Sequence, residues 1–131
     1  WNLNEMYSFI PMMHTDTTIT YLNKTLIIDT KFYKEILGNN RGSRKFRTDN
    51  IYQIFSYVMN YKIQHSTQKV AGLLLYAATK LSLEIDIFPY NCRLGDTPIS
   101  IDILDLSVEP SKIEEQLKQI YTRYFVDNFI F

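Results

Sequence analysis

Two acids and a lysine near the start of the chain have the types and spacing that suit phosphodiester chemistry. Asp29 and Lys31 alternate at the end of an apolar run, so on a strand their side chains project from one face. Asp16 precedes a run rich in β-branched residues. If Asn23 and Lys24 form a hairpin turn, residues whose numbers sum to about 47 are paired, which sets Asp16 across from Lys31 and close to Asp29. We therefore expect two carboxylates and an ammonium to converge at the open end of this hairpin.

A cluster of this composition suits a divalent metal ion. Mg²⁺ prefers oxygen ligands and keeps several waters, so Asp16, Asp29 and the backbone carbonyl of Thr30 are its predicted ligands, with Mn²⁺ as a substitute. The metal would activate a water and neutralise charge in the transition state, and Lys31 would orient that water and stabilise the same charge. An Asp-x-Lys triplet without a catalytic role is the ordinary alternative. Two observations support the catalytic interpretation beside that alternative: the triplet ends an apolar strand, where an unpaired charge is costly to bury, and hairpin pairing brings a second acid to the same place.

A later segment offers a glutamine and a tyrosine on one helix face. Gln53 and Tyr57 are four residues apart in a stretch with apolar residues at helical spacing, so they face the same way. The glutamine would hydrogen-bond a metal-bound water or a DNA phosphate, with Tyr57 as its brace. From the residues alone, packing at the boundary of helix and sheet is the simpler alternative.

Four basic residues follow the predicted site strand within residues 38–47, a segment that also holds two glycines and two asparagines. This composition predicts a mobile basic loop. Its functional interpretation is contact with DNA phosphates near the scissile bond, and its alternative is a solvated loop. The candidate DNA-binding residues are Arg41, Arg44, Lys45 and Arg47.

The elements that must position these residues alternate between strand and helix patterns. We predict strands at 17–22, 25–32, 70–77, 81–90 and 99–106, with a turn over 91–98. One helix follows a cap at Thr48 or Asp49 and ends near His65, and a second begins at Pro110. This order predicts an α/β sandwich with a mixed central β-sheet flanked by helices.

The bulk composition bounds the function. The chain has 131 residues, 46% of them apolar, no net charge and one cysteine, which predicts one folded domain in a reducing cytoplasm, without a membrane span. Neutrality argues against a stand-alone DNA-coating protein but not against an enzyme that another module brings to DNA. The chain begins with Trp1 rather than Met, and its other end is apolar, with Phe125, Val126, Phe129, Ile130 and Phe131. These ends lead us to expect a domain from a longer polypeptide.

Four segments of the chain are distinctive in their order and spacing. They are residues 10–16 (IPMMHTD), 26–34 (LIIDTKFYK), 50–57 (NIYQIFSY) and 70–76 (VAGLLLY). Taken together, these segments resemble the McrC family, the nuclease subunits of McrBC modification-dependent restriction systems. The resemblance covers roughly residues 8–77 and extends more loosely to the last third of the chain. It implies a restriction-endonuclease-like core of the PD-(D/E)XK superfamily over residues 1–131, as the C-terminal part of a longer McrC-like protein.

The resemblance also assigns roles. It implies that Asp16 and Asp29 are the motif acids and Lys31 the catalytic lysine. Gln53 and Tyr57 match the Gln-x-x-x-Tyr helix motif of RecB-type nucleases. The first motif is Thr-Asp rather than Pro-Asp, and Glu5 is the one acid upstream of it, although an upstream helix often supplies another acid in this superfamily. The implied partners are double-stranded DNA and a McrB-like AAA+ GTPase.

The predicted function is a Mg²⁺-dependent DNA endonuclease domain that serves as the cleavage subunit of a modification-dependent restriction system. One alternative is a non-catalytic assembly module that keeps the nuclease fold and docks an AAA+ GTPase. Another is a RecB-like nuclease of the same superfamily.

Overall fold

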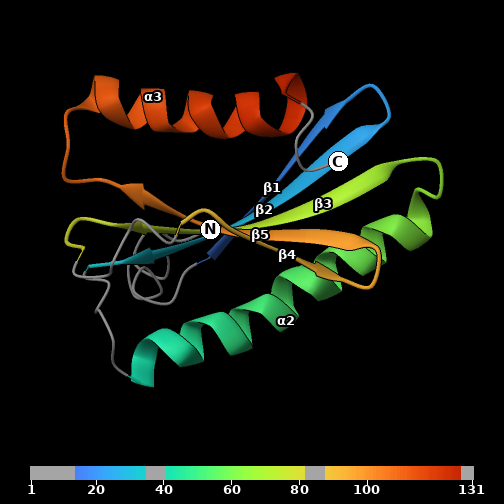
Figure 1. Ribbon diagram of the computed structural model, residues 1–131, viewed down its shortest axis with the longest axis horizontal. Coiled ribbons are helices and arrows are strands. Elements are labelled where there is room, and N and C mark those ends of the chain that lie inside the picture. Colours follow the sequence, from blue (N-terminus) through green and yellow to red (C-terminus); the bar gives the residue numbers. More distant parts are fainter. Residues whose placement is uncertain (1–13, 35–40, 82–87, 128–131) are drawn as a thin grey trace, which may run out of the picture.

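The computed structural model describes residues 14–34, 41–81 and 88–127, and within these ranges the side chains of 14–16 and 41–49 lie outside the description. Five strands form one sheet, with two long helices beside it (Figure 1). The elements are β1 (His14–Tyr21), β2 (Lys24–Tyr33), α2 (Arg41–Gln64), β3 (Lys69–Ala78), β4 (Tyr90–Leu94), β5 (Thr97–Asp105), α3 (Pro110–Tyr121) and a π-helical turn, η3 (Thr122–Val126).

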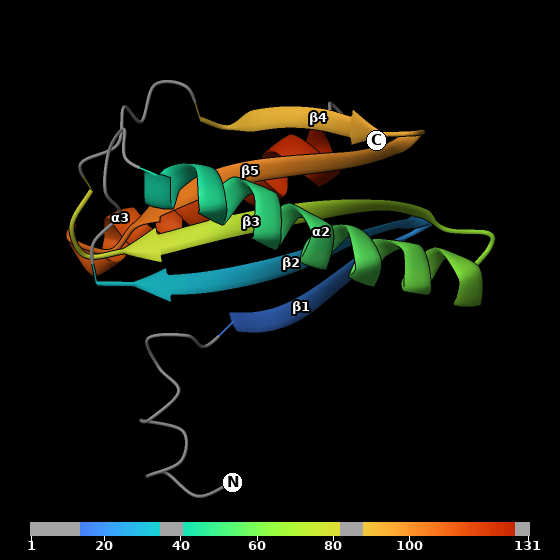
Figure 2. The ribbon, with the colours of Figure 1, turned by 90° about the horizontal axis from the view of Figure 1, so that it is seen from below.

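The sheet is mixed. Its order is β1-β2-β3-β5-β4, and β2, β3 and β5 are parallel while β1 and β4 pair antiparallel at the two edges. Helix α2 covers one face and α3 the other (Figures 1 and 2). The predicted α/β architecture, a mixed central sheet with flanking helices, is confirmed. None of the described helices is long and apolar enough to cross a membrane.

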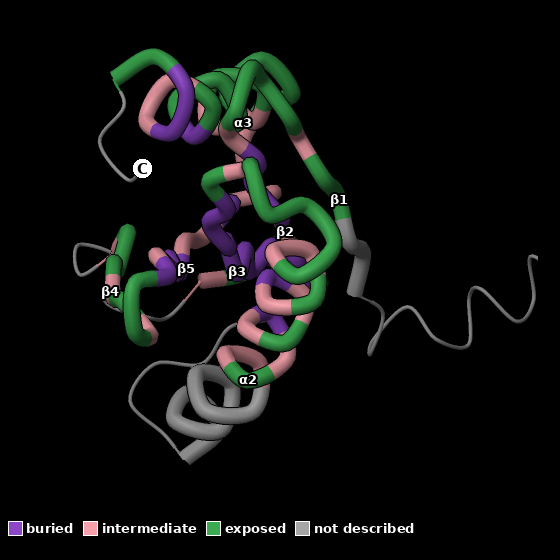
Figure 3. Tube along the Cα trace, turned by 90° about the vertical axis from the view of Figure 1, so that its right-hand side faces the viewer, coloured by how far each residue is buried: buried purple, intermediate pink, exposed green. Residues whose placement is uncertain are grey.

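The central strand β3 is the most deeply buried element of the described chain. Every residue from Val70 to Ala78 is buried, and Figure 3 shows this strand enclosed between the two helical layers. A parallel strand with helices on both faces needs apolar side chains in both directions, which explains the unbroken run VAGLLLYAA. At Gly72 a Cβ would lie 2.9 Å from side-chain atoms of Ile54, Val58 and Ile99, so this glycine lets α2 approach the sheet closely.

The two faces of the sheet carry separate apolar layers. On the α3 side, alternate residues of β2 and β3 pack with the end of the last helix: Leu26, Leu73, Leu75, Ile120 and Tyr124. On the α2 side, the core consists of the intervening residues and the inner face of α2: Ile27, Leu74, Ile99, Ile101, Ile54 and Val58. This alternation fixes which strand residues face α2.

The hairpin of β1 and β2 differs from its predicted register by two residues. Tyr21 pairs with Lys24 and Asp16 with Asp29, because the turn residues are Leu22 and Asn23 rather than Asn23 and Lys24. Leu22 has a φ of 56°, which is the left-handed conformation that a tight hairpin turn demands. A shift by two residues keeps every side chain on its face.

Two other local predictions are wrong. Residues 41–47 form the first turns of α2 rather than a loop, because the breaker Gly42 is followed by residues compatible with a helix, and Thr48 and Asp49 lie within the helix instead of capping it. Residues 91–94 belong to β4 rather than to a turn, and the turn is confined to Gly95, with φ 67°, and Asp96. The strand predicted at 81–90 falls mostly on residues 82–87, outside the described residues.

Candidate active site

Strand β2 brings a carboxylate and an ammonium into the layer between the sheet and α2. Asp29 is fully buried and Lys31 is 8% exposed, and Lys31 Nζ lies 3.5 Å from Asp29 Oδ2. Their Cα partners on β3 are Leu74 and Tyr76. Removing both charges from water costs several kcal/mol per ion, which their attraction offsets only with further polar contacts. A buried pair at this position therefore calls for a functional explanation.

Helix α2 supplies the further polar contacts. Lys31 Nζ donates a hydrogen bond to Gln53 Oε1 at 2.7 Å, and Gln53 Nε2 donates to the Tyr57 hydroxyl at 3.0 Å. The helical repeat sets Gln53 and Tyr57 on the same side of α2, as expected. The amide thus accepts from the lysine with one end and donates to the phenol with the other, which orients both Lys31 and Gln53.

A second hydrogen-bonded group, formed by Asn50 and Tyr76 with Tyr33 beside them, was not predicted from the sequence. Asn50 Nδ2 donates to the Tyr76 hydroxyl at 3.0 Å, and the rings of Tyr33 and Tyr76 lie 5.9 Å apart at 52°. Burial raises the pKa of Tyr33, a hydrogen bond from Asn50 opposes that rise, and the charge of Asp29 adds to it. The sequence did contain a signal for Tyr33, because this residue continues the alternation that sets Asp29 and Lys31 on one face of the strand.

For the other two predicted metal ligands, Asp16 and Thr30, strand pairing gives the positions of the backbone. Asp16 is the Cα partner of Asp29, and directly opposed residues of an antiparallel pair have Cα atoms about 4.5–5.5 Å apart. The side chain of Asp16 lies outside the described part of the chain. Thr30 lies between Asp29 and Lys31, opposite Thr15 and Leu75 on its two neighbouring strands.

The donor set fits a hard cation. A buried carboxylate with a second acid at the opposing register position offers oxygen ligands, which suit Mg²⁺ or Mn²⁺ rather than a metal that prefers thiolates. Among the described residues, no cluster of three or more His, Cys, Asp and Glu side chains is present. A metal here would therefore complete its coordination with water and backbone oxygen, as Mg²⁺ commonly does.

The predicted DNA-contacting residues lie on α2 rather than on a loop. Arg41, Arg44, Lys45 and Arg47 lie within the first two turns of α2. Their side chains lie outside the described part of the chain. Their backbone belongs to the same helix as Asn50 and Gln53, at its N-terminal end.

Comparison with known proteins gives one informative similarity. No protein-family model matches the chain. The chain is 27% identical over 121 residues to the "Type IV methyl-directed restriction enzyme EcoKMcrBC" of Escherichia coli (strain K12), an alignment that covers 92% of this chain and 33% of that protein. The chain thus spans about a third of the length of the curated relative that it matches.

Proposed function

We propose that this chain is a Mg²⁺-dependent DNA endonuclease domain of the PD-(D/E)XK type, the cleavage part of a modification-dependent restriction system. The observation that carries the proposal is the position of Lys31, held between the buried carboxylate of Asp29 at 3.5 Å and the amide of Gln53 at 2.7 Å. The similarity to a restriction enzyme of Escherichia coli supports the same function. So does the α/β sheet with Asp29 on the interior strand β2.

In this mechanism the residues of the chain have distinct tasks. A bound Mg²⁺ would supply Lewis acidity at the phosphate and a water of lowered pKa. Asp29 and Asp16 would hold the ion, with the Thr30 carbonyl as a further oxygen ligand. The Lys31 ammonium would donate to the phosphoryl oxygens as negative charge grows on them, in a site where burial strengthens that interaction.

Gln53 and Tyr57 would act through Lys31. A lysine has several rotatable bonds, so an ammonium without a partner would occupy many positions. The contacts of 2.7 Å from Lys31 to Gln53 and 3.0 Å from Gln53 to Tyr57 limit this freedom. Pre-organised donors contribute more to a transition state than donors that must be ordered during the reaction.

The proposed partners are double-stranded DNA and a McrB-like AAA+ GTPase. The chain has no net charge, and electrostatic attraction to phosphates supplies most non-specific DNA affinity. A partner that binds DNA and delivers it would compensate for this neutrality. The basic residues Arg41, Arg44, Lys45 and Arg47 at the start of α2 would then contact the backbone near the scissile phosphate.

The test is calorimetric titration of Mn²⁺ and Mg²⁺ into the wild type, Asp29→Asn and the control Glu115→Gln, which changes an exposed acid on α3. We expect binding to the wild type and to the control, and its loss in Asp29→Asn. Nicking of circular DNA is measured with this chain alone and with the GTPase partner. It should persist in the wild type and the control and be lost in Asp29→Asn. Equal metal binding by Asp29→Asn and the wild type would refute the metal site and favour a non-catalytic assembly module.

A further inference from the structure

A basic notch opens at the end of the sheet opposite the candidate active site. β3 begins at Lys69, but its pairing with β5 begins only at Gly72 and Ile99. Where the two strands part, a cavity of about 270 Å³ is lined by three cations and one carboxylate. These charged residues are Lys62, Lys69, Arg93 and Asp96. They come from α2, β3 and the hairpin of β4 and β5.

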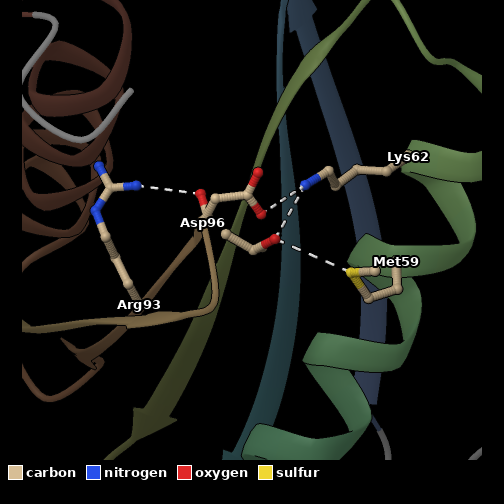
Figure 4. A network of polar contacts seen from close by, with 5 residues as sticks. Met59, Lys62, Arg93 and Asp96 are labelled. Atoms are coloured by element: carbon tan, nitrogen blue, oxygen red, sulfur yellow. Dashed lines mark hydrogen bonds and ion pairs between the residues drawn. The ribbon is translucent and has the colours of Figure 1, made fainter.

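Two of the cations hold the hairpin turn from different sides. Lys62 Nζ donates to Asp96 Oδ1 at 3.4 Å and to Thr97 Oγ1 at 3.1 Å, while Arg93 Nη1 donates to the backbone oxygen of Asp96 at 3.2 Å. Figure 4 shows Lys62 and Arg93 approaching the Asp96 turn from opposite sides. These contacts fix the two cations in place while the Asp96 side chain remains 92% exposed.

The charge around the notch is unbalanced. Three cations and one carboxylate line it, in a chain whose net charge is zero. Lys62 is paired with that carboxylate at 3.4 Å, so Lys69 and Arg93 are in excess. Like charges gathered around one cavity raise its potential and attract a counter-anion. Lys62 lowers the pKa of Asp96 through its hydrogen bond and its charge, so these two side chains form an ion pair. The cavity exceeds the roughly 30 Å³ share of one water several-fold, so it accommodates a tetrahedral oxyanion with its hydration.

We propose that this notch binds a phosphate group, and that its source is the backbone of double-stranded DNA. The choice of DNA rests on the proposed function. On β3, Lys69 lies seven residues from Tyr76, the Cα partner of Lys31, so the notch is about 23 Å along the strand from the candidate active site. At about 3.4 Å per base pair this equals roughly seven base pairs. The notch would thus hold the duplex at a second point away from the scissile bond.

The test is duplex binding followed by fluorescence anisotropy in EDTA, where no cleavage interferes. The variant is Lys69→Ala with Arg93→Ala, which keeps Lys62 as the link between α2 and the hairpin. The control is Lys112→Ala with Lys118→Ala, which removes the same charge from exposed positions on α3. Because each lost phosphate contact reduces the slope of log K against log[salt] by about 0.9, we expect a decrease of roughly 1 to 2 for a duplex of about 20 base pairs.

A second experiment distinguishes DNA from free phosphate as the source of the bound phosphate group. Inorganic phosphate is titrated while the backbone amide resonances of Gly95 and Asp96 are followed by NMR. We expect a saturable change in their chemical shifts in the wild type and none in the notch variant. A phosphate response without any change in duplex binding would overturn DNA as the source. No response in either arm, or an equal loss of duplex affinity in the control, would overturn the site itself.

Failure of this proposal is distinguishable from failure of the proposed function. Duplex binding in EDTA involves no metal ion, so it tests the notch independently of metal binding by Asp29. The notch variant should keep the calorimetric metal binding of the wild type. Loss of metal binding in the notch variant would mean that its substitutions disturb the whole fold, and the separate role of the notch would be refuted.

Discussion

Lys31 and Gln53 are joined by a 2.7 Å hydrogen bond between the interior strand β2 and the helix α2 that covers its face. This bond connects two parts of the chain that are 22 residues apart, and it lies directly beside the buried carboxylate of Asp29. The strand provides the charged pair and the helix determines where its ammonium points.

Replacing Gln53 by Ala should lower DNA cleavage by about 10- to 100-fold, the range that is typical when a residue orienting a functional group is removed. Stability should also fall, by about 1–3 kcal/mol, because a buried ammonium loses its acceptor. Tyr57→Phe should lower cleavage and stability by smaller amounts, because Tyr57 acts on Lys31 only through Gln53. The control is Ser56→Ala on the exposed face of α2, and cleavage rates with urea unfolding provide the measurements. Equal cleavage by Gln53→Ala and Ser56→Ala would show that Lys31 needs no such brace.

The buried pair of Asp29 and Lys31 should be energetically coupled despite its 3.5 Å separation. A double-mutant cycle with Asp29→Asn and Lys31→Met, measured by urea unfolding in EDTA, should give about 1–3 kcal/mol. The exposed pair Glu114 and Lys118 is closer, at 3.2 Å, yet its cycle should give less than about 0.5 kcal/mol because water screens it. If the exposed pair couples as strongly as the buried one, burial does not govern these interactions.

The sequence predicts the main features of this site because they depend on local periodicity. Alternation on a strand sets Asp29 and Lys31 on one face, and the helical repeat sets Gln53 beside Tyr57. The contact between the two elements follows once the helix packs on that face. The chemical role that we assign to these four residues stays a prediction.

Features that depend on turn conformation or tertiary packing were not predictable in this way. The hairpin register depends on Leu22, a residue type that rarely adopts a positive φ. Strand β4 was hidden because Gly95 and Pro98 both signal a turn, whereas Pro98 lies within β5. The contact of Asn50 with Tyr76 spans 26 residues, and no local pattern encodes it.

Gly72 should be intolerant of even a methyl group. In Gly72→Ala the new Cβ would approach Ile54, Val58 and Ile99 at 2.9 Å, and such overpacking costs about 1–3 kcal/mol. Urea unfolding should show that adding Val58→Ala recovers part of this loss, since it removes one of the clashing groups. The comparison is Gly95→Ala, where no atom lies within 4 Å and the strain comes from the positive φ. Val58→Ala should not relieve that strain, and failure to rescue Gly72→Ala would contradict the packing explanation.

Tyr124 should make the fold sensitive to alkali. Burial is the main cause that raises its pKa to about 12 from 10.0, and a hydrogen bond with Ser100 opposes the rise. Between these values the folded state keeps the phenolic proton that the unfolded state has lost. The free energy of unfolding therefore decreases as pH rises from about 10 to 12, by roughly 2–3 kcal/mol in total.

Tyr124→Phe tests this linkage. At neutral pH it should cost about 1 kcal/mol, since the hydrogen bond with Ser100 is lost. As pH rises above 10, where the wild type loses stability at this site, the variant should become the more stable of the two. Urea unfolding across this pH range gives the difference directly. A difference independent of pH would show that ionisation of Tyr124 is not linked to folding. The hydrogen bonds that connect η3, β5 and β4 through Tyr124, Ser100 and Asn91 would then be made by a neutral phenol throughout that range.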